Sequence, residues 1–210
     1  MTVEATELQG QLQLPRKSTA PAGPKGYYPE HANGVIPTRP YRLDPRRAFV
    51  IVLTRPDASN AKPCSAKMAG GDFYPHTLAA APGSSLVVEN HDIMAHALMS
   101  DALPRLQGRT LPPGGQLRID LPKQGKNLHL GDRHFAHVRA DIHLLPGLSA
   151  CTQPDADGKF RLQVAKAGTY TLRVLHRDRQ LVARQLTIKA GRTQQLGTLK
   201  LPALSTPQAD

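Results

Sequence analysis

The sequence contains no tryptophan, only 4% aromatic residues, and only two cysteines in 210 residues. It also lacks any run of the 18 or so apolar residues that a membrane-spanning helix needs, so it predicts a soluble chain without a membrane span. The opening stretch MTVEATELQGQLQLP has no basic segment followed by an apolar run, so no secretory signal is visible. These absences favour either a cytoplasmic protein or a numbering that begins at a mature or truncated end.

The two cysteines limit metal chemistry as well. Cys64 and Cys151 cannot build a metal site by themselves. In an oxidising compartment they could pair, but spacing alone does not establish a disulfide. A disulfide and two free thiols therefore both stay open.

Acidic residues are scarce, with 16 Asp and Glu against 27 Lys and Arg, for a net charge of +11. Lys and Arg outnumber Asp and Glu by 8 to 4 in residues 1–56 and by 10 to 4 in residues 151–210, but only by 9 to 8 between them. A basic surface attracts nucleic acid, anionic surfaces or acidic polymers. Because no aromatics interleave with these charges as stacking platforms, nucleic acid is disfavoured, and an acidic polymer or surface stays open as a partner.

Proline and glycine are abundant in the sequence, with 19 and 17 residues respectively. They separate short runs such as AFVIVLTRP, QLRIDLP and GTYTLRVLHRD, and no segment of twelve or more residues keeps a helical period. The sequence therefore predicts an all-β fold. A loop rich in proline and glycine is expected at residues 15–46, and a loop of that length usually has a function or is partly disordered.

Two resemblances organise this all-β prediction. Residues 151–201, with GKFRLQV, GTYTLRVLHRD and RQLTIKAG, resemble the later strands of a carboxypeptidase-regulatory-like (transthyretin/prealbumin-like) β-sandwich. The opening strands of such a sandwich have counterparts only at the other end of the chain, in LQGQLQLP and AFVIVLTRP. We therefore expect residues 1–56 and 151–201 to form one discontinuous sandwich, residues 57–150 to be inserted into it, and residues 202–210 to form a flexible tail.

The inserted part resembles a cupredoxin, a Greek-key β-sandwich. The resemblance lies in DFYPHTLAAAPGSSLVVENHDIMAHALMS, LPPGGQLRIDLPKQG and HVRADIHLLPG. Both modules together are similar to plastocyanin-like proteins of the methylamine-utilisation type. The resemblance implies a periplasmic or cell-surface location.

Cupredoxins bind copper through two histidines, a cysteine and usually a methionine. The resemblance places His96 and His143 at the two histidine positions, Ala140 at the cysteine position, and no methionine after it. Since strand side chains alternate, Ala140 shares an apolar face with Val138 and Ile142, which predicts core packing. The resemblance thus implies a blue-copper centre that has been lost.

Two functional hypotheses follow. The favoured one is a non-enzymatic binding or assembly protein without a cofactor, which contacts a protein partner or itself, because no catalytic constellation is recognisable. The alternative is a periplasmic copper-binding or electron-transfer protein. It would use His96, His143 and a third imidazole from His91, His76 or His137 to hold Cu(II) or Zn(II) in a non-blue site.

Overall fold

The computed structural model describes residues 6–14, 43–58, 64–125 and 127–204, and it confirms the all-β prediction. Its strands are β1 (Thr6–Gln13), β2 (Phe49–Thr54), β3 (Ala66–Met68), β4 (Phe73–Tyr74), β5 (Thr77–Ala80), β6 (Ser85–Asn90), β7 (His96–Met99), β8 (Thr110–Leu111), β9 (Gln116–Asp120), β10 (Asn127–Asp132), β11 (Arg139–Leu144), β12 (Leu148–Thr152), β13 (Lys159–Val164), β14 (Gly168–His176), β15 (Arg179–Ile188) and β16 (Gln194–Lys200). Two short helices, α2 (Pro45–Ala48) and the 3-10 turn η1 (Pro104–Leu106), complete the described elements.

The predicted loop at residues 15–46 falls largely outside the described residues. Its last four residues are described, and helix α2 begins among them at Pro45, with its first turn capped by the carboxylate of Asp44. Most of the predicted tail at residues 202–210 likewise lies outside the described residues.

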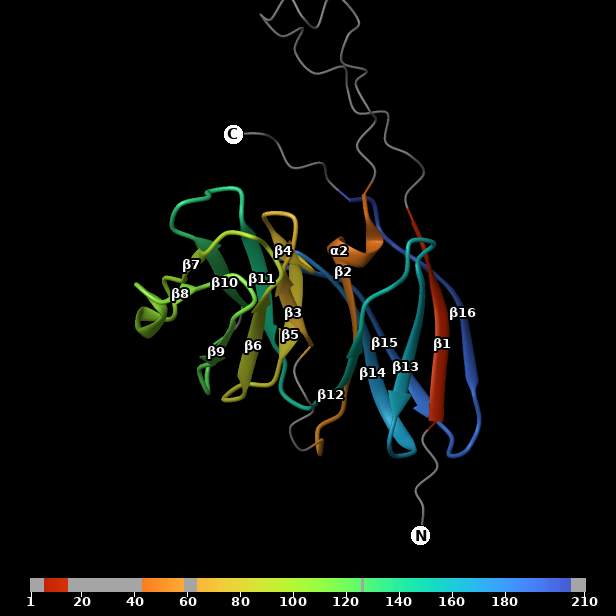
Figure 1. The fold of residues 1–210 in the computed structure, drawn as a ribbon. Helices are drawn as coiled ribbons and strands as arrows, with labels where there is room; N and C mark the ends of the chain where they lie inside the picture. Colours follow the sequence, from red (N-terminus) through yellow and green to blue (C-terminus); the bar gives the residue numbers. More distant parts are fainter. Residues whose placement is uncertain (1–5, 15–42, 59–63, 126, 205–210) are drawn as a thin grey trace, which may run out of the picture.

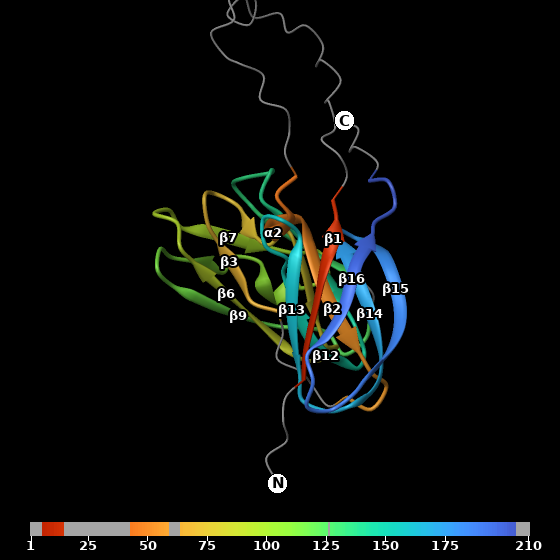
Figure 2. The same ribbon diagram turned by 90° about the vertical axis from the view of Figure 1, so that its right-hand side faces the viewer.

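Four sheets form two groups of strands that lie next to each other (Figure 1). We call the first group the terminal sandwich, because its sheets β13-β1-β16 and β12-β2-β14-β15 combine strands from both ends of the chain. We call the second group the central sandwich, with sheets β5-β11-β10-β7-β8 and β4-β3-β6-β9. Figure 2 views the molecule with β13, β1 and β16 in front.

Strand β2 explains how the two sandwiches are held together. All six of its residues are buried, which a strand achieves only when both faces of its sheet are covered. Phe49, Ile51 and Leu53 point into the terminal core, whereas Val50 and Val52 join a separate apolar cluster with Ala79 and Ala81 of the central sandwich. The apolar run FVIVL is therefore central to both the terminal core and the contact between sandwiches.

Two further links cross between the sandwiches. Cys64, just before β3, and Cys151, in β12, are joined by a disulfide, which is one of the two alternatives that the spacing left open. Gly147, between β11 and β12, has φ +70° and accepts a hydrogen bond from Arg55 N at 2.8 Å. A Cβ atom at Gly147 would lie 2.1 Å from the Arg55 carbonyl oxygen, so this close approach requires glycine.

No helical segment among the described residues has the length and apolar character needed to cross a lipid bilayer.

Candidate functional site

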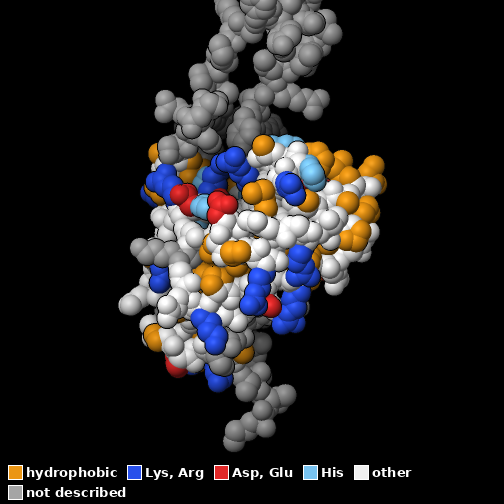
Figure 3. All heavy atoms as spheres, turned by 90° about the vertical axis from the view of Figure 1, so that its left-hand side faces the viewer, with side chains coloured by type: hydrophobic (Ala, Val, Ile, Leu, Met, Phe, Trp, Pro, Cys, Tyr) orange, Lys and Arg blue, Asp and Glu red, His pale blue; other side chains and the backbone are white. Residues whose placement is uncertain are grey.

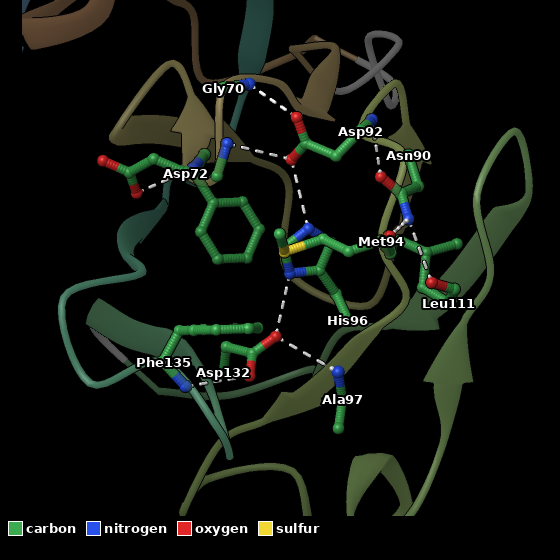
Figure 4. A network of polar contacts seen from close by, with 12 residues as sticks. Gly70, Asp72, Asn90, Asp92, Met94, His96, Ala97, Leu111, Asp132 and Phe135 are labelled. Carbon is green, nitrogen blue, oxygen red and sulfur yellow. Dashed lines mark hydrogen bonds and ion pairs between the residues drawn. The ribbon is translucent and has the colours of Figure 1, made fainter.

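His96 begins β7 and is completely buried, and its imidazole lies between two carboxylates (Figure 4). Its Nδ1 atom is 3.0 Å from Oδ2 of Asp132, and its Nε2 atom is 3.1 Å from Oδ2 of Asp92. We call Asp92, His96 and Asp132 the buried triad. Both ring nitrogens of His96 are therefore already engaged within the protein.

The two carboxylates are themselves fixed by backbone donors from two loops and from strand β7. Oδ1 and Oδ2 of Asp92 accept hydrogen bonds from the N–H groups of Gly70 and Gly71 at 2.6 and 3.1 Å. The carboxylate of Asp132 accepts from the N–H groups of Ala97, His134 and Phe135. The triad thus ties the β3–β4, β6–β7 and β10–β11 loops together at one end of the central sandwich.

The chemistry of this arrangement is structural. Each ring nitrogen of His96 lies within hydrogen-bond distance of a carboxylate oxygen inside the protein, so neither nitrogen faces open space. Buried polar groups are stable where hydrogen bonds satisfy them, as the backbone donors do for both carboxylates here.

His143 has a different environment. It lies in β11 with 4% of its surface exposed, and its Nε2–H donates to the carbonyl oxygen of Arg177 at 2.6 Å. Arg177 belongs to the turn between β14 and β15 of the terminal sandwich. His143 is therefore a contact between the two sandwiches.

The structure does not bring His96 and His143 together. His143 pairs with Asn127 at the start of β10, whereas Asp132, the partner of His96, lies at the end of β10. Five residues along a strand span about 17 Å. The structure therefore places the two imidazoles near opposite ends of β10 and does not bring this predicted pair together.

The other predicted site residues lie in separate environments as well. Ala140 is 1% exposed and packs in the central core with Val138 and Ile142, so the predicted apolar face of β11 is confirmed. His91 pairs with Glu89 on the surface, and His76 lies 3.4 Å from Asp72.

The remaining candidate, His137, contacts Phe135, whose ring also lies edge-on to His96. Among the described residues no three His, Cys, Asp or Glu side chains form a group that could hold a metal ion.

Three histidines at or near the contact between the sandwiches have a lowered pKa. Burial lowers the pKa of His143 and, with help from Arg177 and Arg179, lowers the pKa of His176 to about 4. Burial also lowers the pKa of His76, although Asp72 acts in the opposite direction. These imidazoles are therefore neutral near pH 7.

Sequence reasoning missed both carboxylates of the buried triad. Asp92 had a local signal, because it lies four residues before His96 in the stretch DIMAH. Asp132 had none, because it lies 36 residues from His96 and reaches it only through the pairing of β7 with β10.

No protein-family model matches the chain, and no curated protein matches it. Among solved structures, it is similar to amicyanin from Paracoccus versutus, with 11% identity over 45% of this chain and 97% of that chain at a TM-score of 0.34. It is also similar to the copper-containing nitrite reductase of Thermus scotoductus, with 22% identity over 43% of this chain and 25% of that chain at a TM-score of 0.34. A third similarity is to a multicopper oxidase from Campylobacter jejuni, with 9% identity over 70% and 61% of the two chains at a TM-score of 0.26. At this level of similarity no site residue or activity is transferred to this chain.

The residues present do not fit the copper centre that the sequence resemblance implies. His96 is occupied by two carboxylates, His143 lies at the far end of β10, and both cysteines form the disulfide. The arrangement as a whole stabilises three loops, and no step of copper chemistry can be derived from it.

Proposed function

We propose that the chain is a non-enzymatic binding or assembly protein, built on a cupredoxin-like sandwich whose copper centre has been lost. The observation that supports the proposal is the use of both nitrogens of His96 by Asp92 and Asp132. In this proposal, the histidine that would bind metal in a copper protein instead has a structural role within the buried triad.

The buried triad also shapes an exposed surface of the central sandwich. The contact between Oδ2 of Asp92 and Nε2 of His96 closes a short turn that contains Ile93, Met94 and Ala95, which we call the apolar tip. Ile93 is 96% exposed and Met94 is 42% exposed. Figure 3 shows that hydrophobic side chains gather along one edge of this side of the molecule, apart from most lysines and arginines. Contiguous exposed apolar side chains of this kind are typical of protein–protein contacts.

Several features support further parts of the proposal. The strand order of the terminal sandwich, in which β1 and β2 pair with β12 to β16, supports a carboxypeptidase-regulatory-like sandwich with the central sandwich as an insertion. The disulfide between Cys64 and Cys151 supports a periplasmic or cell-surface location, because disulfides persist in oxidising compartments. The alternative, a copper-binding or electron-transfer protein that uses His96 and His143, is less well supported because the two imidazoles lie far apart.

Metal titration tests the loss of the copper centre. Cu(II) is added to the full chain, to His96→Gln and to the surface control His91→Gln, and binding is followed by calorimetry and electron paramagnetic resonance. We expect the same weak binding to surface histidines in wild type and His96→Gln. A saturable 1:1 site that disappears in His96→Gln would overturn the proposal.

A second copy of the chain is the first partner to test, because an apolar surface that meets its own copy forms a closed two-fold contact. Size-exclusion chromatography with light scattering measures the mass of the full chain, of Ile93→Ser and of the control Val87→Ser. We expect a concentration-dependent dimer that Ile93→Ser abolishes and Val87→Ser retains. A monomer at every concentration would rule out self-assembly through the tip.

A further inference from the structure

A cleft of about 780 Å³ lies over one face of the terminal sandwich. Its floor is the three-stranded sheet β13-β1-β16, which faces the viewer in Figure 2. The link between β12 and β13 lines it as well, and Arg46 and Tyr74 complete its wall. The cleft lies mainly on the terminal sandwich, with Tyr74 of β4 as its contribution from the central sandwich, and none of its lining residues belongs to the buried triad or the apolar tip.

Strand register arranges the cleft's side chains in two rows across the three strands. Gln9 on β1 is paired with Arg161 on β13 and with Gln195 on β16. Two residues further along β1, Gln11 is paired with Lys159 and with Thr198. We call these six residues the polar rows.

The side chains of the polar rows point outward, because their neighbours Leu8, Leu12, Phe160 and Leu162 are buried in the terminal core. None of the six is apolar, and each can donate a hydrogen bond. The face is therefore a continuous array of amide, hydroxyl and cationic donors.

The charges of the polar rows are positive and spaced along one strand. Lys159 has no ion-pair partner in the part of the chain that the structure describes. Arg161 is 77% exposed and has only a loose contact with Glu7, at 3.8 Å. Two residues along a strand separate these two cations by about 7 Å. They can therefore meet negative groups at successive positions of an extended ligand.

The amides of the cleft are held in defined positions. Gln195 donates to Oε1 of Gln9 at 2.8 Å, Gln9 donates to Glu7, and Gln11 donates to the carbonyl oxygen of Asp157 at 3.0 Å. The nearby Asp155 carboxylate is used within its own turn, where it accepts from the backbone N–H groups of Asp157 and Lys159. Both of these bonds end on Oδ1 of Asp155, so this oxygen is used within the turn.

The lining disfavours several ligand classes. The Phe160 ring is buried, and the Tyr74 ring is approached by the cationic groups of Arg47 and Lys67, so neither ring is a free platform on which a nucleic-acid base could stack. Besides these two rings, Pro154 is the single apolar side chain of the lining, which is too little to receive a lipid chain or a hydrophobic peptide. The remaining match is a polyhydroxylated ligand with negative groups, whose hydroxyls bind amides and whose carboxylates form charge-assisted bonds with Lys159 and Arg161.

We propose that this cleft binds a linear acidic oligosaccharide, with its carboxylates at Lys159 and Arg161 and its hydroxyls at Gln9, Gln11 and Gln195. The inference goes beyond the proposed function and does not depend on it, because the apolar tip and the triad lie on the other sandwich. It also gives the basic terminal sandwich a ligand that its charge attracts.

Calorimetric titration of the full chain tests the inference with tetragalacturonate as the acidic probe and maltotetraose as the neutral one. We expect saturable 1:1 binding of tetragalacturonate that weakens with added salt, and none of maltotetraose. Lys159→Ala/Arg161→Ala should weaken binding by at least about tenfold, because two charge-assisted bonds are lost. The matched control Arg118→Ala/Lys189→Ala removes the same charge elsewhere on the surface and should bind as wild type does.

Three results would overturn the inference: no saturable binding of tetragalacturonate, equal binding of maltotetraose, or unchanged affinity in Lys159→Ala/Arg161→Ala. Circular dichroism checks that this variant is folded, and Gln9→Ala/Gln195→Ala, expected to bind less tightly, gives an independent second test. Ile93→Ser should bind tetragalacturonate normally, which separates a failure of the cleft from a failure of the apolar tip.

Discussion

At the scale of single residues, the central feature is an imidazole that two carboxylates hold in place. His96 is completely buried, and the oxygens of Asp92 and Asp132 that face it also receive backbone N–H groups. Removing one member of such a network leaves buried charge without a partner, which costs far more than the loss of a surface ion pair. The triad should therefore be essential to the stability of this end of the central sandwich.

We predict that His96→Gln lowers the free energy of unfolding by about 3–5 kcal/mol, because the single nitrogen of the glutamine amide cannot take the place of both ring nitrogens, so one carboxylate loses its side-chain partner. Urea denaturation followed by circular dichroism measures the change. The control His91→Gln removes a surface histidine that is paired with Glu89, and it should leave the unfolding curve unchanged within error. Equal stability of the two variants would show that the triad contributes nothing.

At the scale of elements, the β14–β15 hairpin attaches the terminal sandwich to the central one. Its turn residue Arg177 has φ +52°, its N–H donates to Oγ1 of Thr77 at 2.7 Å, and its carbonyl oxygen accepts from His143. Asn127 donates to the carbonyl oxygen of Asp178 at 2.8 Å. These bonds place a turn of one sandwich against strands β5, β10 and β11 of the other, so the hairpin joins the two sandwiches.

The contact of this hairpin with the central sandwich is predicted to weaken in acid, which lowers the free energy of unfolding. The pKa values of His143 and His176 in the folded protein lie below the usual value of 6.5, and that of His176 is about 4. Between these values the unfolded chain binds more protons than the folded chain, so stability is full above about pH 6.5 and falls as the pH drops toward 4. The expected loss is about 1–3 kcal/mol, measured by urea unfolding at a series of pH values.

Charged neighbours also act on these histidines: Asp141 and Asp178 on both of them, and Arg177 and Arg179 on His176. The comparison that isolates the imidazoles is therefore His143→Gln/His176→Gln, in which the carboxylates and arginines remain. Its stability should change less between pH 7 and pH 4 than that of wild type. The same pH dependence in both proteins would contradict the assignment to these histidines.

At the scale of the whole molecule, the disulfide closes the part of the chain that forms the central sandwich. Cys64 and Cys151 are 87 residues apart in sequence, and their bond lies beside the apolar cluster of Val50, Val52 and Leu175 between the sandwiches. A cross-link across so long a segment restricts the unfolded chain strongly. The disulfide should therefore stabilise the folded state of the whole molecule.

We predict that Cys64→Ala/Cys151→Ala lowers the free energy of unfolding by about 2–5 kcal/mol, measured by urea denaturation. A reductant should destabilise wild type by a similar amount and leave the double variant unaffected, which serves as the control. A wild-type protein that is insensitive to reductant would contradict the prediction.

The sequence by itself determined the properties that depend on short-range pattern. Alternation along residues 138–142 predicted the buried face with Val138, Ala140 and Ile142, and frequent prolines and glycines predicted short strands. The buried face follows from the two-residue period of a strand, and the short strands follow from the way proline and glycine interrupt the chain, so neither needs knowledge of neighbouring strands.

Only the tertiary structure decided what the histidines do. His96 meets Asp132 across 36 residues through the pairing of β7 with β10, and His143 meets Arg177 across 34 residues through the contact between two sandwiches. Alternation along β11 carries no information on the Arg177 carbonyl of the other sandwich, to which the buried His143 donates. Partners of this kind are set by how sheets pack against each other, and local pattern carries no information about that packing.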